Sequence, residues 1–368
     1  MKLLAACSPG EIRVAAVDET GLVDYAVWRP GAPDGVGDLH RGRVAARVPA
    51  MAGAFVRLEG GADGFLPDSE GGSGVSEGQA LGVRVVRAAQ GGKGPRLTAH
   101  LDAAGSALVG AGPPSLLRRG PGAVERLAAL HPDAPVELDD AAVAAVLRPV
   151  LGERLRLTRA AFDDDVAAQA AALAEPEAAL PGGARLTVYP TPALTAIDID
   201  LGASTGARGS KARTQFAANL ALLPPLARQI RLRNLSGAIL VDLGGVSVSR
   251  RARLGPELQA AMSTDPLAPR LLGFTALGLA EILRPRVHPP LHDVLAGPHA
   301  AGLAALRAAD AAFSARPHRA PALRAAPAVE AALRADPVAL ADWLRRTGHP
   351  FPVRPDPTLP ACAWSLDE

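Results

Sequence analysis

Two acidic residues stand at the end of an apolar run in the stretch LTAIDIDLGAS, residues 194–204. If this run is a β-strand, the side chains of Asp198 and Asp200 lie on the same face, because residues two apart in a strand point the same way. Adjacent carboxylates repel each other unless a cation or strong hydrogen-bond donors compensate their charge. The pair therefore indicates either a solvated strand end or a cation site.

A second apolar run also ends in a carboxylate. The stretch SGAILVDLGG places Asp242 at the C-terminal end of a predicted buried strand. Two neighbouring strands of an α/β sheet that end in Asp would bring Asp198 and Asp242 to one rim, where such sheets bind ligands. Carboxylate oxygens are ligands for a hard cation such as Mg²⁺, and phosphate can complete its coordination. Such an ion activates water and neutralises charge on a phosphodiester, so we predict a metal site here.

Charge is unevenly distributed around this predicted site, although the net charge of the 368-residue chain is only +2. Residues 160–200 contain seven acidic residues and one basic residue, whereas residues 206–286 contain twelve basic and four acidic residues. An acidic cluster beside a basic field suits a metal site that faces a polyanion. The basic segments ARGSKAR, ARQIRLR and SRRARL could contact a nucleic-acid backbone, and the candidates chosen from them are Arg208, Lys211, Arg231 and Arg233.

The segments around these residues read as alternating strands and helices, which indicates an α/β layer. Residues 185–200 predict two strands around a proline-containing turn, and a helix is expected over about 211–233 with a break or restart at Pro224–Pro225. The run RLLGFTALGLAEILRPR is expected to pass from strand into helix. Further helical patterns cover 139–180, 254–264 and 327–346, and acidic residues 163–165 suit a helix start.

The N-terminal third predicts β-structure. Residues 10–30 read as two strands around a turn, and residues 38–101 contain several short β-like runs separated by glycine-rich turns, which favours an OB-fold barrel. Phe55 and Phe65 are either core residues of this barrel or platforms on which bases stack. Lys93, in the loop GGKG, could contact phosphate.

The overall composition favours a cytoplasmic protein. Hydrophobic residues make up 48% of the chain, but no apolar stretch approaches the roughly 20 residues needed to span a bilayer. The two cysteines, Cys7 and Cys362, exclude a disulfide scaffold and fit a reducing compartment. We therefore expect no membrane partner.

The run PALTAIDID, followed by RGSKARTQFAANLALLPPLARQIRLRNLSGAILVDL, resembles the catalytic segment of the ribonuclease E/G family. The stretches RGRVAARVPAMAGAFVRL, DGFLP and GGKGPRLTAHL are similar to the RNA-binding OB-fold domain of that family. The resemblance covers most of residues 10–295. It implies that Asp198 and Asp242 hold catalytic Mg²⁺, with Mn²⁺ as an alternative. Asp200 stands where the family commonly has Asn, and it is either a third ligand or a residue just outside the ligand set.

The resemblance also implies a multidomain α/β (α+β) fold, in which an OB-fold barrel is inserted in an RNase H-like subdomain and a DNase I-like catalytic domain follows. In chain order, we expect an N-terminal RNase H-like segment (1–36), the barrel (37–102), a short connector (103–135), a second RNase H-like segment (136–188), the DNase I-like domain (189–298) and a small accessory domain (299–368).

Two departures from the family pattern affect the expectation. The connector leaves little chain for the family's 5′-monophosphate pocket, and Arg118 with Arg119 is either a phosphate contact or a solvated basic turn. The family's Cys-x-x-Cys zinc link between protomers has no counterpart, so no zinc is expected. His288, His292 and His299 are either surface residues or a replacement metal site.

The function expected from the residues and the resemblance together is that of an Mg²⁺-dependent endoribonuclease. It would cleave single-stranded RNA by water attack on phosphorus, leave 5′-phosphate and 3′-hydroxyl ends, and act in rRNA or mRNA processing. A homodimer is one assembly to test. The alternative is a non-catalytic RNA-binding protein on a drifted ribonuclease scaffold.

Overall fold

The computed structural model describes residues 1–202, 211–244, 248–316 and 321–367, without the side chains of residues 211–214 and 248–249. The chain divides into two compact units. One unit comprises residues 34–122 with 286–289, and the other comprises residues 1–33, 123–285 and 290–368. Within the described residues, no helix is both long and apolar enough to cross a membrane.

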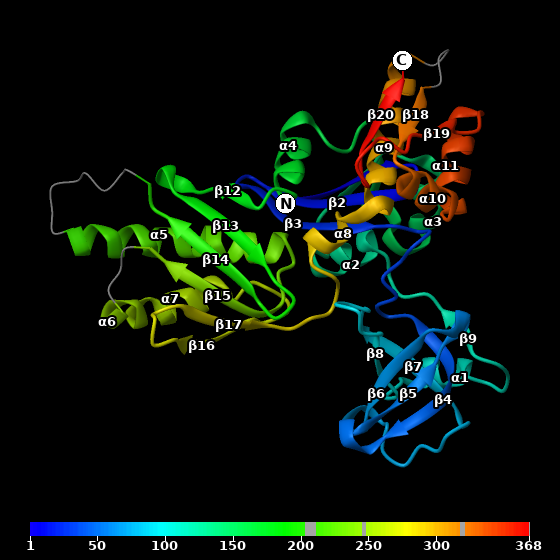
Figure 1. Cartoon of the computed structure of the whole chain (residues 1–368), viewed down its shortest axis with the longest axis horizontal. Coiled ribbons are helices and arrows are strands. Elements are labelled where there is room, and N and C mark those ends of the chain that lie inside the picture. Colours follow the sequence, from blue (N-terminus) through cyan, green and yellow to red (C-terminus); the bar gives the residue numbers. More distant parts are fainter. Residues whose placement is uncertain (203–210, 245–247, 317–320, 368) are drawn as a thin grey trace. The chain divides into compact units, whose positions relative to one another are not determined.

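The smaller unit is a closed β-barrel, shown in blue and cyan in Figure 1. Five strands pair around a ring in the order β4-β5-β6-β8-β7 and back to β4. A sixth strand, β9, pairs with the start of β4, on the edge opposite to the one that β7 occupies. This architecture fits the OB-like barrel expected from the sequence. The elements are β4 (Leu39–Val48), β5 (Gly53–Arg57), β6 (Asp63–Pro67), β7 (Ala80–Arg87), β8 (Arg96–Thr98), α1 (Ala103–Leu108) and β9 (Ser115–Arg118).

Alternating residues of the barrel strands form its core. The buried side chains that cluster there are Val56, Leu58, Leu66, Val83, Val85 and Leu97. Because successive residues of a strand face opposite sides, Phe55 and Phe65, which flank Val56 and Leu66, point away from this core. The connector is also more ordered than expected, since residues 115–118 extend the barrel sheet.

The larger unit begins with a five-stranded sheet, called here the N-terminal sheet, in the order β11-β10-β1-β2-β3. Its strands β1 and β2 are buried along most of their length because helices cover both faces of the sheet. The sheet and its helices comprise β1 (Lys2–Ser8), β2 (Glu11–Asp18), β3 (Gly21–Trp28), α2 (Ala123–Leu130), β10 (Val136–Leu138), α3 (Ala141–Leu151), β11 (Leu155–Leu157) and α4 (Asp164–Ala172). The start of α4 agrees with the expectation, because Asp163 caps it by accepting a hydrogen bond from the Val166 N–H at 2.8 Å.

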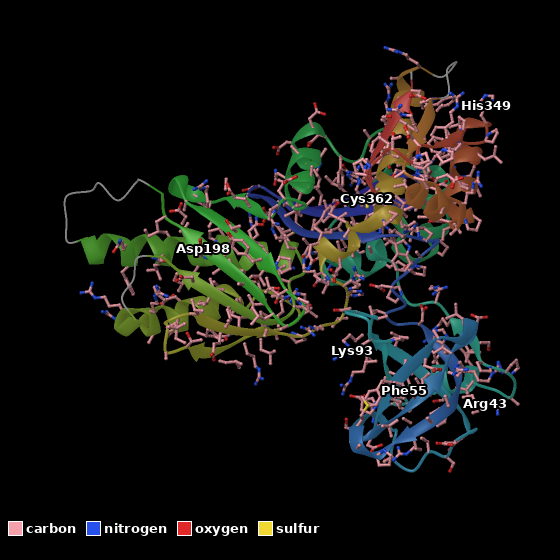
Figure 2. All side chains as sticks on the ribbon, in the orientation of Figure 1. Arg43, Phe55, Lys93, Asp198, His349 and Cys362 are labelled. Atoms are coloured by element: carbon pink, nitrogen blue, oxygen red, sulfur yellow. The ribbon has the colours of Figure 1, made fainter. Side chains whose placement is uncertain are left out.

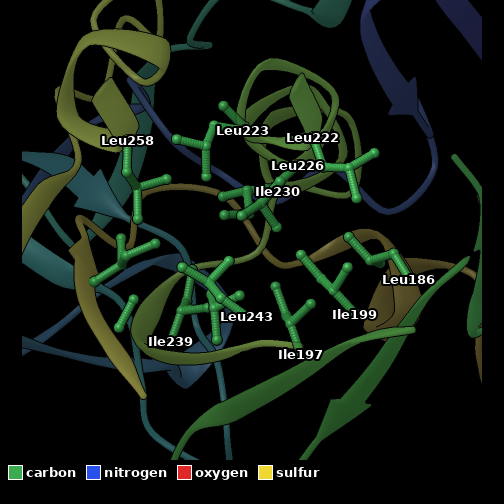
Figure 3. Packing of buried hydrophobic residues seen from close by; sticks show 14 of the residues in the cluster. Leu186, Ile197, Ile199, Leu222, Leu223, Leu226, Ile230, Ile239, Leu243 and Leu258 are labelled. Carbon is green, nitrogen blue, oxygen red and sulfur yellow. The ribbon is translucent and has the colours of Figure 1, made fainter. Parts of the chain in front are cut away.

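A six-stranded mixed sheet, the middle sheet, has the strand order β12-β13-β14-β15-β17-β16. Strands β14 and β15 are parallel and are joined through helix α5, so the three form a β-α-β unit. Apolar residues of the sheet pack against α5 and α7 on one face (Figure 3). The elements are β12 (Glu177–Ala179), β13 (Arg185–Pro190), β14 (Thr195–Asp200), α5 (Lys211–Leu232), β15 (Gly237–Leu243), α6 (Val248–Arg251), α7 (Gly255–Ala261), β16 (Arg270–Phe274) and β17 (Ala280–Arg284).

Three expectations about these segments are corrected by the structure. Helix α5 runs unbroken through Pro224 and Pro225. Residues 280–284 form a strand rather than a helix. The helical pattern at 139–180 contains two short strands, β11 and β12, in addition to α3 and α4.

A small three-stranded sheet, ordered β19-β18-β20, completes the larger unit. The fully buried Trp343 lies in its core, in contact with the rings of Phe313 and Phe351. The pattern at 327–346 folds as two helices, because Pro337 starts a new one. The elements are α8 (Leu291–Val294), α9 (Gly297–Ala315), β18 (Ala322–Ala325), α10 (Pro327–Arg334), α11 (Pro337–Thr347), β19 (Val353–Pro355) and β20 (Trp364–Asp367).

Ion pairs join this C-terminal region to the N-terminal sheet. Arg307 of α9 donates to the buried carboxylate of Glu11 at 2.6 Å. Arg346 of α11 donates to the buried carboxylate of Asp140 at 2.6 Å, and Arg345 donates to the same oxygen at 2.9 Å. Two carboxylates of the N-terminal half therefore find their cationic partners near the other end of the chain.

Candidate functional site

Asp198 and Asp242 are direct neighbours on two parallel strands. Their Cα positions pair in the register of β14 with β15. Adjacent strands lie about 4.8 Å apart, and paired residues project from the same face of a sheet. The sequence expectation that the two strand ends would bring these carboxylates together therefore agrees with the backbone of the structure.

The face that carries the two carboxylates is set by the apolar residues between them. Ile197 and Ile199 of β14 and Val241 of β15 are buried against α5, whose Leu222, Leu223, Leu226 and Ile230 cover that face (Figure 3). Since strand side chains alternate, Asp198 and Asp242 must point to the opposite, uncovered face. Burial of the isoleucine and leucine side chains thus fixes where the acidic groups lie.

The two carboxylates differ in their surroundings. Asp198, labelled in Figure 2, is exposed, and in the described part of the chain its carboxylate has no hydrogen-bond or ionic partner. Asp242 is 46% exposed and accepts a hydrogen bond from Nη1 of Arg251, the last residue of α6, at 2.9 Å. The same nitrogen donates to the carbonyl oxygen of Gly278 at 2.9 Å. Arg251, only 12% exposed, therefore ties the Asp242 carboxylate to the turn that follows β16.

Asp200 shares a face with Asp198 but is bonded to other groups. It accepts hydrogen bonds from the Gly202 N–H at 2.9 Å and from Nη2 of Arg185 at 3.1 Å. These two hydrogen bonds, first that of Gly202 and then that of Arg185, lower the pKa of the Asp200 carboxyl. Arg185 of β13 thus partly compensates the charge of Asp200. This favours a position of Asp200 beside the Asp198–Asp242 pair over direct binding of a metal ion.

The donor set suits a hard divalent cation. Among the described residues, no three Asp, Glu, His or Cys side chains form a ready-made metal cluster. Mg²⁺, however, is commonly held by one or two carboxylates and completes its octahedral shell with water and substrate phosphate. Two registered carboxylates on an uncovered sheet face meet this requirement. Asp198 and Asp242 could therefore hold such an ion.

Two arginines that the sequence nominated for RNA contact make ion pairs or hydrogen bonds inside the larger unit, Arg231 half-buried and Arg233 buried. Arg231 donates from Nε to Asp24 Oδ1 at 2.5 Å, and its Nη2 also donates to that carboxylate. Its Nη1 donates to the carbonyl oxygen of Thr264 at 2.8 Å. His131 Nε2 lies 2.9 Å from the same Asp24 carboxylate. Arg231 therefore holds α5 against β3 of the N-terminal sheet.

Arg233 has a similar structural role. It is 5% exposed and donates to the carbonyl oxygens of Leu173 and Glu175, beyond the end of α4, and to Gln229 Oε1 at 2.9 Å. Burial lowers the pKa of its guanidinium group. The donors of Arg231 and Arg233 are thus engaged within the protein, which favours a structural role for both residues over RNA contact. Arg208 and the side chain of Lys211 lie outside the described residues.

On the barrel, the two phenylalanines form a partly exposed pair. Phe55 and Phe65 are register partners on β5 and β6, and their ring centroids lie 5.6 Å apart in an edge-to-face arrangement. Neither ring belongs to the barrel core, and both side chains are half-buried at the outer surface of the barrel. Lys93 is exposed in a glycine turn between β7 and β8, closed by backbone hydrogen bonds between Gln90 and Lys93 (Figure 2).

Arginines that the sequence analysis did not single out lie beside the phenylalanine pair. Arg96 is the register partner of Phe65, and Arg87 is the register partner of Arg96. The pKa of Arg87 is lowered by burial and by the charges of Arg96 and Arg286. Like charges that crowd in this way would be relieved by a polyanion. Little in the sequence indicated that Arg87 and Arg96 lie together, because arginine is abundant along the whole chain.

The three histidines do not share a site. His288 Nδ1 lies 2.5 Å from an Asp34 oxygen, and His299 Nε2 lies 2.9 Å from an Asp336 oxygen. His292 is beside Asp293 at 3.6 Å. Each histidine has its own carboxylate neighbour, which favours separate structural roles over a replacement metal site.

Comparison with known proteins identifies relatives of the segment that contains both aspartates. The model of the Ribonuclease E/G family matches residues 146–287. Ribonuclease G of Escherichia coli (strain K12) is 37% identical over 117 residues, which cover 32% of this chain and 24% of that protein. Ribonuclease E of Synechocystis sp. is 30% identical over 125 residues, which cover 34% of this chain and 18% of that protein. The matched segment thus spans about a quarter or less of these curated relatives.

Proposed function

We propose that the chain, whose residues 146–287 match the model of the Ribonuclease E/G family, is a metal-dependent endoribonuclease that cleaves single-stranded RNA. The observation that carries this proposal is the registered pair Asp198 and Asp242, which lies within the matched segment and on an uncovered sheet face. The relatives named ribonuclease G and ribonuclease E support the same class of reaction. The domains carrying the site and the N-terminal sheet would be the DNase I-like and RNase H-like regions of the expected fold.

Asp198 and Asp242 would hold the catalytic ion, Mg²⁺ or alternatively Mn²⁺, through their carboxylate oxygens. A divalent ion bound there would lower the pKa of a water molecule and neutralise negative charge on the phosphodiester. Water attack on phosphorus would leave 5′-phosphate and 3′-hydroxyl ends. Asp198, with no partner in the described part of the chain, is the more accessible ligand.

Arg251 acts in this proposal as a positioning residue. Its hydrogen bond fixes the orientation of the Asp242 carboxylate, and its bond to Gly278 fixes its own. The guanidinium charge also offsets one of two adjacent carboxylates, which reduces their mutual repulsion in the absence of a cation. The site can therefore keep its geometry before an ion binds.

The barrel would supply affinity for RNA. Base stacking on Phe55 and Phe65, with phosphate contacts from Arg96 and Lys93, is the usual combination for binding single strands without sequence readout. This assignment rests on the edge-to-face ring pair outside the barrel core and on Arg96 and Arg87 beside it.

The expected cytoplasmic location agrees with the two free thiols. Whether the chain forms a homodimer can be measured by light scattering.

The rival function is that of a non-catalytic RNA-binding protein, and one experiment separates the two. We expect a labelled single-stranded oligonucleotide to be cleaved with Mg²⁺ and left intact with chelator. Asp198→Asn and Asp242→Asn should each slow cleavage at least about 100-fold while RNA affinity changes less than about twofold, because the binding surfaces lie elsewhere. Glu281→Gln, a carboxylate on the same sheet, is the matched control and should cleave like the parent protein.

Two results would favour the rival. RNA binding without Mg²⁺-dependent cleavage by the parent protein would identify a binding protein. Cleavage that persists in both aspartate variants would move the reaction away from this site.

A further inference from the structure

Three arginine side chains gather on one face of the N-terminal sheet, away from the aspartate pair. Arg13 lies in β2, Arg29 directly follows β3, and Arg307 lies in α9. Glu11 and Arg13 are two apart in β2, so their side chains share a face. The register of β2 with β3 continues to Ile12 and Trp28, which places Arg29 beside Glu11.

Two of these arginines share a single carboxylate. Arg29 donates from Nε and from Nη2 to Glu11 Oε2, each at 3.1 Å. Arg307 donates from Nη1 to Glu11 Oε1 at 2.6 Å. Glu11 is only 2% exposed, and both of its oxygens accept hydrogen bonds from these guanidinium groups.

Arg13, in contrast, has no anionic partner among the described residues. Its Nε is buried and makes no hydrogen bond, and its guanidinium carbon lies 5.2 Å from the centre of the Phe162 ring. Burial and the neighbouring charge of Arg307 lower the pKa of Arg13. The other carboxylate whose field reaches Arg13, Asp139, already accepts hydrogen bonds from the N–H groups of Cys7 at 2.8 Å and Ala161 at 3.0 Å.

A tyrosine hydroxyl lies in the same charged environment. Burial, modified by the charges of Arg13 and Glu11, raises the pKa of Tyr25 to about 12, so the hydroxyl stays protonated at neutral pH. In the described part of the chain it has no hydrogen-bond partner. A guanidinium group only donates hydrogen bonds, and a protonated tyrosine hydroxyl can donate one as well as accept, so both groups can donate to a bound anion.

The excess of positive charge in this cluster destabilises the folded protein. Three guanidinium cations face the one buried carboxylate Glu11, which leaves two positive charges in excess locally, or one if Asp139 is included. A partly buried cation without a counter-charge is unfavourable, and a buried polar group without a partner calls for a bound ion or water. An anion that accepts several hydrogen bonds would satisfy Arg13 and balance the charge at once.

We propose that Arg13, together with Arg29, Arg307 and Tyr25, forms a binding site for a phosphate group. Guanidinium groups match the oxygens of phosphate through pairs of parallel hydrogen bonds. Phosphate carries the double charge that offsets the local excess, and its oxygens can meet donors arriving from β2, β3 and α9. The source is either free orthophosphate or the phosphate of a nucleoside monophosphate. The site is independent of the proposed cleavage site.

Thermal unfolding of the full chain tests this proposal with inorganic phosphate as the probe. Phosphate is added against sodium chloride of equal ionic strength, because ligands that bind only the folded state raise the midpoint of unfolding. The parent protein should gain several degrees at saturation. Arg13→Met should lose at least two thirds of that gain, and without phosphate it should unfold at the same temperature as the parent or higher, since an unpaired cation has been removed.

Arg156→Met is the matched control, because Arg156 is an exposed arginine on β11 of the same sheet. It should respond to phosphate like the parent protein. If Arg13→Met fails to fold, Arg307→Gln replaces it and should likewise reduce the response. The proposal would be overturned if phosphate raised the unfolding temperature equally in the parent, the control and the Arg13 or Arg307 variant. It would also be overturned if calorimetric titration of the parent with phosphate gave no heat up to 10 mM, which is roughly tenfold above a millimolar Kd.

The two sources of phosphate are separated by a second titration. A nucleoside 5′-monophosphate that binds at least tenfold more tightly than orthophosphate, with the difference lost in Arg13→Met, would assign the site to a nucleotide. Equal affinities would assign it to free phosphate. Affinity of the monophosphate that is unaffected by Arg13→Met would place its binding elsewhere and contradict the proposal.

Discussion

Replacement of Arg231 by alanine tests whether this residue belongs to the fold or to an RNA-binding surface. Asp24 is 6% exposed and receives two hydrogen bonds from Arg231 and a contact from His131. Truncation of Arg231 leaves this carboxylate buried and without its guanidinium partner, with the His131 ring still beside it. Removal of one partner of a buried ion pair typically costs about 3–5 kcal/mol, and we expect a loss of stability in this range.

The assay is urea denaturation of the parent protein and of Arg231→Ala, combined with RNA binding under native conditions. The expected result is a lower denaturation midpoint with unchanged RNA affinity of the folded fraction. Asp24→Asn combined with Arg231→Gln should recover much of the loss, because both charges are removed together. Arg228→Ala is the matched control on the same helix, since the hydrogen bonds that Arg228 makes to Thr20 are exposed to solvent. A loss of less than about 1 kcal/mol, or a fall in RNA affinity at unchanged stability, would refute the buried role.

Three further predictions follow from the barrel, the helix caps and the missing zinc ligands. Phe65→Ala should weaken binding of single-stranded RNA by about 1–3 kcal/mol in a fluorescence titration, and an unchanged affinity in a folded variant would return the ring to a packing role. Burial raises the pKa of the Asp140 carboxyl, but hydrogen bonds from the Val143 N–H and from Arg345 outweigh it, so the pKa lies below the usual 3.8. The ionised carboxylate therefore stabilises the fold above pH 3.8, and this stabilisation disappears as the pH falls through the lower pKa of the folded state. Asp140→Asn should therefore reduce the free energy of unfolding by about 1.5–3 kcal/mol at pH 7 and progressively less below pH ~4; a pH-independent difference would contradict the assignment. Substrates with 5′-monophosphate and 5′-hydroxyl ends should be cleaved at rates within about threefold, a gap under ~0.7 kcal/mol, and metal analysis should find no stoichiometric zinc; a strong preference or one zinc per two chains would show otherwise.

The aspartate pair could be predicted from the sequence because the signals are local. The segment TAIDID alternates apolar and acidic residues at its end, and GAILVDL is a short apolar run closed by an acidic residue, so both read as strands that end in a carboxylate. What the sequence did not contain was the partner of Asp242. Arg251 is nine residues away, in a basic segment read as an RNA contact, and only the position of α6 directs it to the carboxylate.

The errors arose where tertiary packing overrides a local rule. Pro224 and Pro225 should interrupt α5, yet Leu222, Leu223 and Leu226 are buried on the middle sheet, while Pro224 is exposed. The carbonyl groups that proline leaves unpaired can therefore meet water, and burial of the leucines maintains the helix. The ion pair of Arg231 could not be foreseen for a related reason, because its partner Asp24 is 207 positions away and no local pattern connects them.

The ion pairs between the C-terminal region and the N-terminal sheet also determine when the protein can finish folding. Glu11 and Arg307 are separated by 296 positions, and Asp140 and Arg346 by 206. At the usual rate of about 5–20 residues per second, ribosomes would need roughly 10–40 s to advance from Asp140 to Arg346. During that interval Asp140 lacks both of its arginine partners, and Glu11 is paired with Arg29 alone until Arg307 has been added. Such long-range contacts also slow refolding of the full chain, so closure of the N-terminal sheet should be a late step in its maturation.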